Sequence, residues 1–169
     1  MSVVRFYGDP HFSHKWMATH RGFQDEFYHD EHIIDTWNSV VNKKDTTYIL
    51  GDITLEKHTP YPLLDRLLGR KIVVLGNHDP RQYVKQLLEH VDHVAGCIMY
   101  KGYFLTHIPI HPGEFEYRDI KGNIHAHTHE RIITDDYRYI CVSAEIIKYK
   151  PITLDQVNAI FDKNKLKTT

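Results

Sequence analysis

The stretch IVVLGNHD, residues 72–79, passes without a break from an apolar run into Gly-Asn-His-Asp. A short apolar run that ends at a turn residue predicts a buried strand, here over residues 71–75. In open α/β sheets, ligands bind at the carboxyl ends of strands, because the loops there converge on one crevice. Asn77, His78 and Asp79 are therefore expected at a functional edge of a sheet.

Polar clusters of the same kind end four other predicted strands. Asp9 and His11 follow a strand expected over residues 2–7, and Asp52 follows a second one over residues 46–50. Two later strands end in the remaining donors, which are His107, His127 and His129. Together with Asn77, these side chains supply enough nitrogen and oxygen atoms at one edge to predict a metal site.

The chemistry of these donors narrows the choice of metal. They are imidazole, carboxylate and amide groups, and no cysteine lies in any cluster. Divalent ions such as manganese, iron and zinc accept such donors. One ion takes three or four protein ligands, so this larger set suits two ions, with Asp52 as a natural bridge. Asn77 adds an amide oxygen without adding negative charge that would repel an anionic substrate.

The order of elements indicates an α/β protein, because apolar β-rich runs alternate with segments of helical period. Further strands are expected within residues 91–107 and over 122–127 and 136–143. Helices are expected over residues 29–42, 61–69 and 80–89. A capping box formed by Thr153 and Gln156 predicts a last helix to about residue 162. The Lys-rich tail at 163–169 is expected to be frayed.

Length and composition set limits on the class of protein. The 169 residues correspond to one domain, and the formal net charge of −1 argues against nucleic-acid binding by bulk electrostatics. Cys97 and Cys141 are too few for a disulfide framework and are expected to be buried, in a reducing compartment. No apolar run approaches the roughly 18 residues of a membrane span, and no leader segment is visible. A cytoplasmic protein without membrane contact is therefore expected.

The ordered set of motifs resembles the calcineurin-like metallophosphoesterase superfamily. The motifs are GDPH at 8–11, GD at 51–52, GNHD at 76–79, TH at 106–107 and HAHTH at 125–129. They span most of the chain, and GNHD after an apolar strand is the most specific of them. One departure is visible, because Ala126 stands where the family usually has glycine. The added methyl group removes no ligand.

The resemblance implies a four-layer αββα sandwich with two divalent metal ions at the sheet edges, manganese first and iron, zinc or nickel as alternatives. It implies a first ion held by Asp9, His11, Asp52 and His129, and a second held by Asp52, Asn77, His107 and His127. His78 would be a catalytic histidine that binds no metal, beside Asn77 and Asp52 in the catalytic set. With hydroxide between the ions as the nucleophile, His78 would stabilise the transition state or protonate the leaving oxygen.

Details of the motifs favour a phosphodiester substrate. Phosphoserine/threonine phosphatases of the superfamily usually have GDxVDRG and GNHE, whereas this chain has GDITLE at 51–56 and GNHD, without that arginine. The DxHFxH pattern at 9–14 and THIPxHP at 106–112 are more similar to small bacterial and phage phosphoesterases. A small phosphodiester, a nucleotide or a nucleic-acid end is the expected substrate. A phosphomonoesterase or protein phosphatase and an inactive metal-binding scaffold stay open as alternatives.

Side chains in the loops around the ligands are candidates for substrate contact. The phosphate candidates are His14, Arg21, His111 and Arg118. The aromatic residues interleaved with them, which offer surfaces for a base, are Phe12, Trp16, Phe23 and Tyr117. Packing of the long loop onto the core also explains Phe12 and Phe23. Asp79 is expected to support its loop, and His125 to support neighbouring ligands rather than to bind metal.

Overall fold

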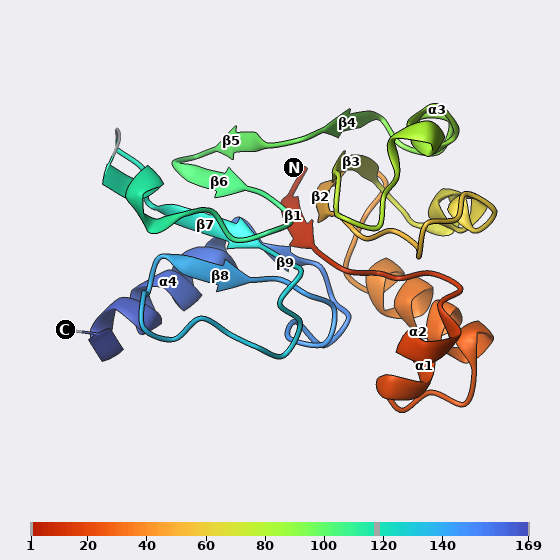
Figure 1. Ribbon diagram of the computed structural model, residues 1–169, viewed down its shortest axis with the longest axis horizontal. Coiled ribbons are helices and arrows are strands. Elements are labelled where there is room, and N and C mark those ends of the chain that lie inside the picture. Colours follow the sequence, from red (N-terminus) through yellow and green to blue (C-terminus); the bar gives the residue numbers. More distant parts are fainter. Residues whose placement is uncertain (1, 117–118, 169) are drawn as a thin grey trace.

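The computed structural model describes residues 2–116 and 119–168, and it contains two mixed β-sheets flanked by helices (Figure 1). The five-stranded sheet has the order β4 (His93–Ala95), β3 (Arg70–Val74), β2 (Thr46–Leu50), β1 (Val4–Tyr7) and β9 (Ile152–Thr153). Strands β1 to β4 are parallel, and β9 runs antiparallel to β1. The predicted α/β class and metallophosphoesterase-like αββα architecture are thereby confirmed.

The four-stranded sheet has the order β5 (Ile98–Tyr100), β6 (Tyr103–Leu105), β7 (Gly122–His125) and β8 (Tyr139–Cys141). Only β5 and β6 are antiparallel, joined through Lys101 and Gly102. Past the end of β8, Ser143 forms a parallel bridge with Gly8, which follows β1. This bridge brings the ends of strands from both sheets to one edge.

Alternating side chains of β1 connect the layers. The Phe6 ring lies 6.1 Å from the ring of Tyr100 in β5, whereas the Tyr7 ring lies 5.3 Å from the indole of Trp37. Trp37 belongs to α2 (Glu26–Asn38), so β1 contacts the other sheet through one face and a helix through the other. α1 (Lys15–His20) lies against α2, and α4 (Leu154–Thr168) extends to the end of the molecule opposite α1 and α2 (Figure 1).

Two predicted helices are wrong in type or length. The segment predicted as a helix over 61–69 is a 3₁₀ helix, η1 (Tyr61–Arg66). The predicted helix over 80–89 is a 3₁₀ turn, η2 (Arg81–Tyr83), followed by one turn of α-helix, α3 (Val84–Leu87). The first part of each connection, residues 51–60 and 75–80, is an irregular loop at the end of the strand. Only a short segment is therefore left for a helix before the next parallel strand begins.

Other element boundaries also differ from the predicted ones. α2 begins earlier than residue 29, because the side chain of Asp25 accepts a hydrogen bond from the Tyr28 N–H and caps the helix. Neither α1 nor η3 (Pro112–Glu116) nor β9 was predicted, since each is short and carries no clear periodicity. Cys141 is buried as expected, but Cys97 is exposed because it lies in the link between the edge strands β4 and β5.

The last helix is longer than predicted. The capping box is present, since Thr153 Oγ1 accepts from the Gln156 N–H and Gln156 Oε1 accepts from the Thr153 N–H. The helix then continues through Thr168, so the segment expected to be frayed from residue 163 is helical in its described part. Lys165 and Lys167 lie in its last turn, where positive charge interacts favourably with the helix dipole.

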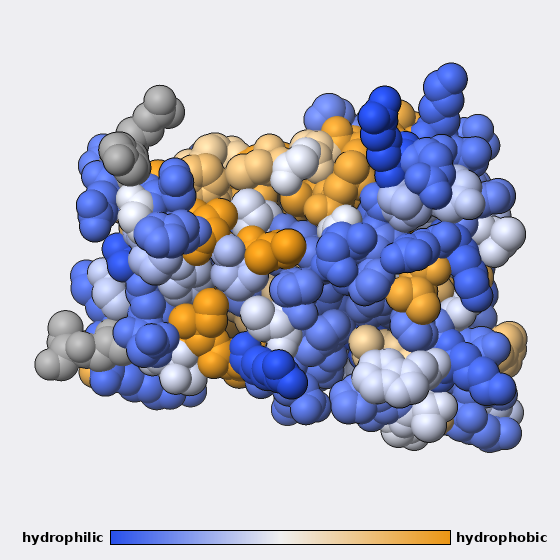
Figure 2. Space-filling view, in the orientation of Figure 1, coloured by the Kyte–Doolittle hydropathy of each residue, from blue (hydrophilic) through white to orange (hydrophobic). Residues whose placement is uncertain are grey.

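The surface seen in Figure 2 is mainly hydrophilic, with apolar side chains gathered over β4 and β5. Within residues 2–116 and 119–168, no helix is long and apolar enough to span a membrane.

Candidate metal centre

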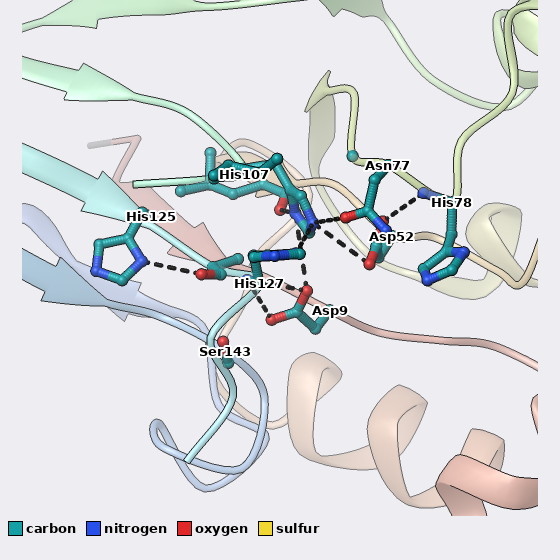
Figure 3. A network of polar contacts seen from close by, with 12 residues as sticks. Asp9, Asp52, Asn77, His78, His107, His125, His127 and Ser143 are labelled. Atoms are coloured by element: carbon teal, nitrogen blue, oxygen red, sulfur yellow. Dashed lines mark hydrogen bonds and ion pairs between the residues drawn. The ribbon is translucent and has the colours of Figure 1, made fainter. Parts of the chain in front are cut away.

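Two groups of ligand-type side chains lie at the shared edge of the sheets. One group contains Asp9, His11 and His129, and the other contains Asp52, His107 and His127. In each group the potential ligand atoms lie within 4.8 Å of one another. Asp52 Oδ2 lies 3.3 Å from His107 Nε2 and 3.7 Å from His11 Nε2, so it faces both groups. The convergence predicted from the strand ends is seen in Figure 3, where Asp9, Asp52, His107 and His127 point toward one another.

The backbone at these positions adopts an uncommon conformation. Positive φ angles occur at Asp9 (53°), His11 (49°), Asp52 (53°), His127 (67°) and His129 (51°). The left-handed region costs a non-glycine residue about 1 kcal/mol or more, so it recurs only where the surrounding structure imposes it. The sharp turn at each strand end aims its ligand into the site instead of along the sheet.

Two glycines let the ends of β2 and β3 approach each other closely. Gly51 has a φ of 78°, and a Cβ atom there would lie 2.5 Å from the Gly76 backbone nitrogen. A Cβ atom on Gly76 would lie 2.3 Å from Asp52 Oδ1. Any larger residue at either position would therefore displace Asp52 from the centre of the site.

Asp79 ties these same loops together, which agrees with its predicted supporting role. Its Oδ2 accepts hydrogen bonds from the backbone N–H groups of Asp52 (2.7 Å) and Gly76 (2.8 Å), and its Oδ1 accepts from Ile53 (2.9 Å). The side chain is buried, which raises the pKa of the carboxyl group despite these bonds. Asp79 thus holds Asp52 in place through the backbone.

His107 shows how the second group is arranged for a cation. Its Nδ1 donates to the Leu50 carbonyl oxygen at 2.7 Å, which leaves Nε2 directed at Asn77 Oδ1 (2.9 Å) and His127 Nδ1 (3.2 Å). Burial disfavours the charged ring, but the Asp52 carboxylate outweighs it and raises the pKa of His107. A proton on His107 and a bound divalent cation would both interact favourably with the Asp52 carboxylate and Asn77 Oδ1. The cation would replace the proton, so metal binding here is expected to release protons.

His11 provides the clearest test of whether the residues fit a metal. Both ring nitrogens are buried without a hydrogen-bond partner among the described residues. Burial lowers the pKa of His11 to about 2, so its ring is neutral and carries a free lone pair. Buried polar atoms are otherwise almost always paired. An ion bound beside Asp9 and His129 would satisfy this lone pair, and the oxygen and nitrogen donor set suits it.

Glu145 supports the first group, and no motif in the sequence predicts this role. Glu145 Oε1 accepts from His129 Nδ1 at 2.8 Å, and this bond holds the His129 ring beside Asp9. Burial opposes ionisation of Glu145, but the bonds from His129 and Arg21 lower its pKa to about 2. A carboxylate behind a ligating histidine fixes the ring orientation and raises its basicity.

Arg21 was predicted to contact substrate, and the structure places it elsewhere. Its Nη2 donates to Glu145 Oε2 (2.8 Å) and to the Asp9 carbonyl oxygen (2.9 Å), while its side chain is only 2% exposed. The guanidinium group is therefore held beneath the ligand loop by buried acceptors. Arg21 is therefore placed to support the ligand loop through these bonds, and it is not among the residues that line the cavity.

Replacing Glu145 by glutamine tests this support. The amide keeps the size of the side chain and one acceptor, but it loses the charge that His129 and Arg21 face. We expect the affinity for one of two metal ions to fall about 10- to 100-fold, the usual effect of losing such a partner. Titration of chelator-stripped protein with Mn²⁺, followed by electron paramagnetic resonance, measures it. Glu31→Gln is the matched control, because Glu31 pairs with Arg66 on the surface; equal affinities in the two variants would contradict the role.

A cavity of about 670 Å³ opens beside the two groups. It is lined by His11, His14, Trp16, Met17, His20, Asp52, Asn77, His78, His127, Thr128, His129, Glu130 and Arg131. His78 is half-buried in its wall, and its Nδ1 lies 3.5 Å from Glu56 Oε1. Its backbone N–H donates to Asp52 Oδ1 at 2.9 Å, so the ring stands next to the metal groups without belonging to either.

The remaining candidates divide between the cavity and other places. His14 lines the cavity, with its ring 5.5 Å from that of His11. His111 is exposed, accepts from the Gly113 N–H and is not among the residues that line the cavity, so a substrate contact there is not supported. Tyr117 and Arg118 lie outside the described residues. Phe12 is 1% exposed, in the core.

Two further expectations concern residues next to the ligands. Phe23 packs edge-on against the rings of His29 and Tyr149, so it belongs to loop packing and not to the cavity. His125 is buried and points away from the ligands in Figure 3, with Nδ1 bonded to the Ala126 carbonyl oxygen. Burial lowers the pKa of His125 to about 4, which keeps the ring neutral.

The methyl group of Ala126 is accommodated as expected. A Cβ atom on Gly8 would lie 2.4 Å from the Cβ of Ala126, so the absence of a side chain at residue 8 provides the room. The backbone that carries His127 and His129 therefore keeps its place beside β1.

Comparison with known proteins agrees with this fold. An uncharacterized protein of Methanocaldococcus jannaschii is 30% identical over 185 aligned positions that cover all of this chain and 98% of that protein. A protein of unknown function from Aquifex aeolicus has a similar structure, with a TM-score of 0.72 and 27% identity over 95% of this chain and all of that one. An archaeal phosphodiesterase shares the fold, with a TM-score of 0.50 and 17% identity over 83% of this chain and 81% of that one. No model of a protein family matches the sequence.

Proposed function

We propose that the chain is a member of the calcineurin-like metallophosphoesterase superfamily and that it hydrolyses phosphodiesters at a dinuclear metal centre. The observation that carries the proposal is that two His/Asp groups lie side by side next to an open cavity. Asp52 belongs to one group and also lies close to His11 of the other. A structural metal site is closed, whereas a catalytic one keeps a side open to substrate.

The proposed ligands follow from the two groups. Asp9, His11 and His129 would hold one ion and His107, His127 and Asn77 the other, with Asp52 shared between them. Two such ions supply a Lewis acid for the phosphoryl oxygens and a nucleophile at neutral pH. Manganese, iron, zinc and nickel all accept this donor set, and manganese is the first choice for the test.

The chain's own residues would orient the substrate and move a proton. The Asp79 and Glu145 carboxylates keep the ligands in place before substrate arrives, through the bonds described above. His78 in the cavity wall can donate a proton to the leaving-group oxygen or stabilise its charge. The His78 ring stands next to Asp52 but belongs to neither group of potential ligands, and this position suits that role better than metal binding.

The charge of the cavity wall favours a diester over a monoester. A diester carries one negative charge, whereas a monoester dianion carries nearly two and is usually held by arginine. Arg131 is the only arginine or lysine among the described residues that line the cavity, and Arg21 is engaged below it. The archaeal phosphodiesterase of the same fold is consistent with this choice.

The test compares bis(4-nitrophenyl) phosphate with 4-nitrophenyl phosphate. Protein stripped with a chelator and refilled with Mn²⁺ is expected to hydrolyse the diester with the higher kcat/KM, and the stripped protein is expected to be inactive on both. A higher kcat/KM for the monoester would contradict the substrate class. A metal-loaded protein that hydrolyses neither ester would favour an inactive scaffold.

A further inference from the structure

Trp16 is the feature of the cavity that metal chemistry does not explain. Trp16 is 63% exposed, although exposure of its large aromatic side chain to water is energetically unfavourable. The packing of α1 onto the core is carried instead by Met17 and Ala18, which are buried. Trp16 therefore does not serve the fold, and it lines the cavity next to the metal groups.

The indole stacks on a side chain of the same helix. It stacks on the imidazole of His20, with ring centroids 4.9 Å apart and planes inclined by 7°. Both rings line the cavity. Because an exposed tryptophan alone would sample several rotamers, this stack reduces the entropy that a ligand would otherwise have to remove.

A row of rings connects this stack to the metal groups. The His11 ring lies 5.5 Å from that of His14, and the His14 ring lies 6.3 Å from that of Trp16. A phosphate bound near His11 would thus be separated from the indole by two ring-to-ring steps. The aromatic surface lies where the organic part of a phosphodiester would extend.

The charge of the same wall points to a polar aromatic group and not to a lipid. Arg131 lines the cavity, is exposed and has no side-chain partner among the residues that the structure describes. A free guanidinium group offers hydrogen bonds to a base edge or to a second phosphate. Stacking on an aromatic ring together with a cationic contact is the usual way in which proteins hold single nucleotides.

We propose that Trp16 is the base-stacking platform of a nucleotide subsite, so that the substrate is a phosphodiester carrying a nucleobase next to the scissile phosphate. The inference rests on the proposed function, because it places the scissile phosphate at the metal groups. Stacking of one base on such a platform corresponds to about a tenfold effect on affinity or more.

Fluorescence tests the platform without any turnover. The chain has two tryptophans, and Trp37 is only 1% exposed, so quenching by a bound base reports on Trp16. Zinc-loaded protein is titrated with adenosine 5′-monophosphate and, separately, with ribose 5-phosphate. We expect saturable quenching by the nucleotide alone and loss of that signal in Trp16→Phe. Quenching that persists in Trp16→Phe, or that ribose 5-phosphate matches, would overturn the proposal.

Substrate preference gives the second readout. Thymidine 5′-(4-nitrophenyl phosphate) and methyl 4-nitrophenyl phosphate share a leaving group and differ in the base. Trp16→Ala is expected to lower the kcat/KM ratio of the first to the second about tenfold through KM, and Trp16→Phe to retain most of the ratio. Phe27→Ala, at an equally exposed aromatic residue outside the cavity, is the control. An unchanged ratio in Trp16→Ala would refute the platform. Hydrolysis of neither diester, with nucleotide quenching intact, would refute the phosphodiesterase activity and leave the base site standing.

Discussion

Replacing Asp52 by alanine is expected to abolish the dinuclear centre and lower kcat/KM for a phosphodiester about 10³-fold or more. Asp52 Oδ2 faces His107 at 3.3 Å and His11 at 3.7 Å, so its loss weakens both groups at once. Two ions together supply several kcal/mol of transition-state stabilisation, and each 1.36 kcal/mol corresponds to tenfold in rate. Metal analysis of the refilled variant is expected to find fewer than two ions per chain.

The control for this variant separates loss of metal from loss of fold. Asp52 is almost fully buried, so its replacement could also disturb folding. The far-UV circular dichroism and thermal unfolding of Asp52→Ala are therefore compared with those of the metal-free wild type. Asp65→Ala is the matched variant, because Asp65 is an exposed aspartate that pairs with His90 outside the cavity. We expect two ions and ordinary turnover in Asp65→Ala. Two tightly bound ions and near-normal turnover in Asp52→Ala would rule out the shared-ligand geometry.

The convergence of the candidate ligands could be predicted from the sequence because each candidate directly follows a predicted strand. An apolar run that ends in a polar cluster predicts a strand, and it also predicts that the cluster lies at the carboxyl edge of the sheet. β3 and the following Asn77 are an example. Parallel pairing of β1, β2 and β3 then brings Asp9 and Asp52 together without further information. Elements with strong periodicity, such as α2 and the start of α4, were found for the same reason.

The supporting residues could not be predicted because their contacts are non-local. Glu145 follows β8 and reaches the site through the bridge between Gly8 and Ser143, a pairing that no pattern in either segment indicates. Arg21 was misplaced because a charged loop residue is usually exposed, whereas here three different segments supply acceptors for its guanidinium group. Such buried ion pairs depend on tertiary packing, which local sequence does not encode.

Replacing His78 by alanine is expected to lower kcat about 10²- to 10⁴-fold while both metal ions stay bound. The imidazole lines the cavity and belongs to neither ligand group, so its removal takes away a proton donor and no ligand. Alanine keeps the backbone N–H that donates to Asp52 Oδ1, and the Asp52 geometry should therefore survive. Metal analysis and steady-state kinetics on the same preparation measure the two effects separately.

The leaving group decides how His78 acts. A general acid matters most when the departing oxygen is strongly basic, so the defect of His78→Ala should grow from 4-nitrophenyl to phenyl esters of the same phosphodiester. A ring that only stabilises charge on the phosphoryl group would give similar defects for both esters. His58→Ala is the matched control, since His58 is an exposed histidine that packs on Tyr83 outside the cavity. If His78→Ala turned over both esters at the rate of this control, His78 would have no part in the chemistry. In that case the proton would have to reach the leaving oxygen from solvent through the open side of the cavity.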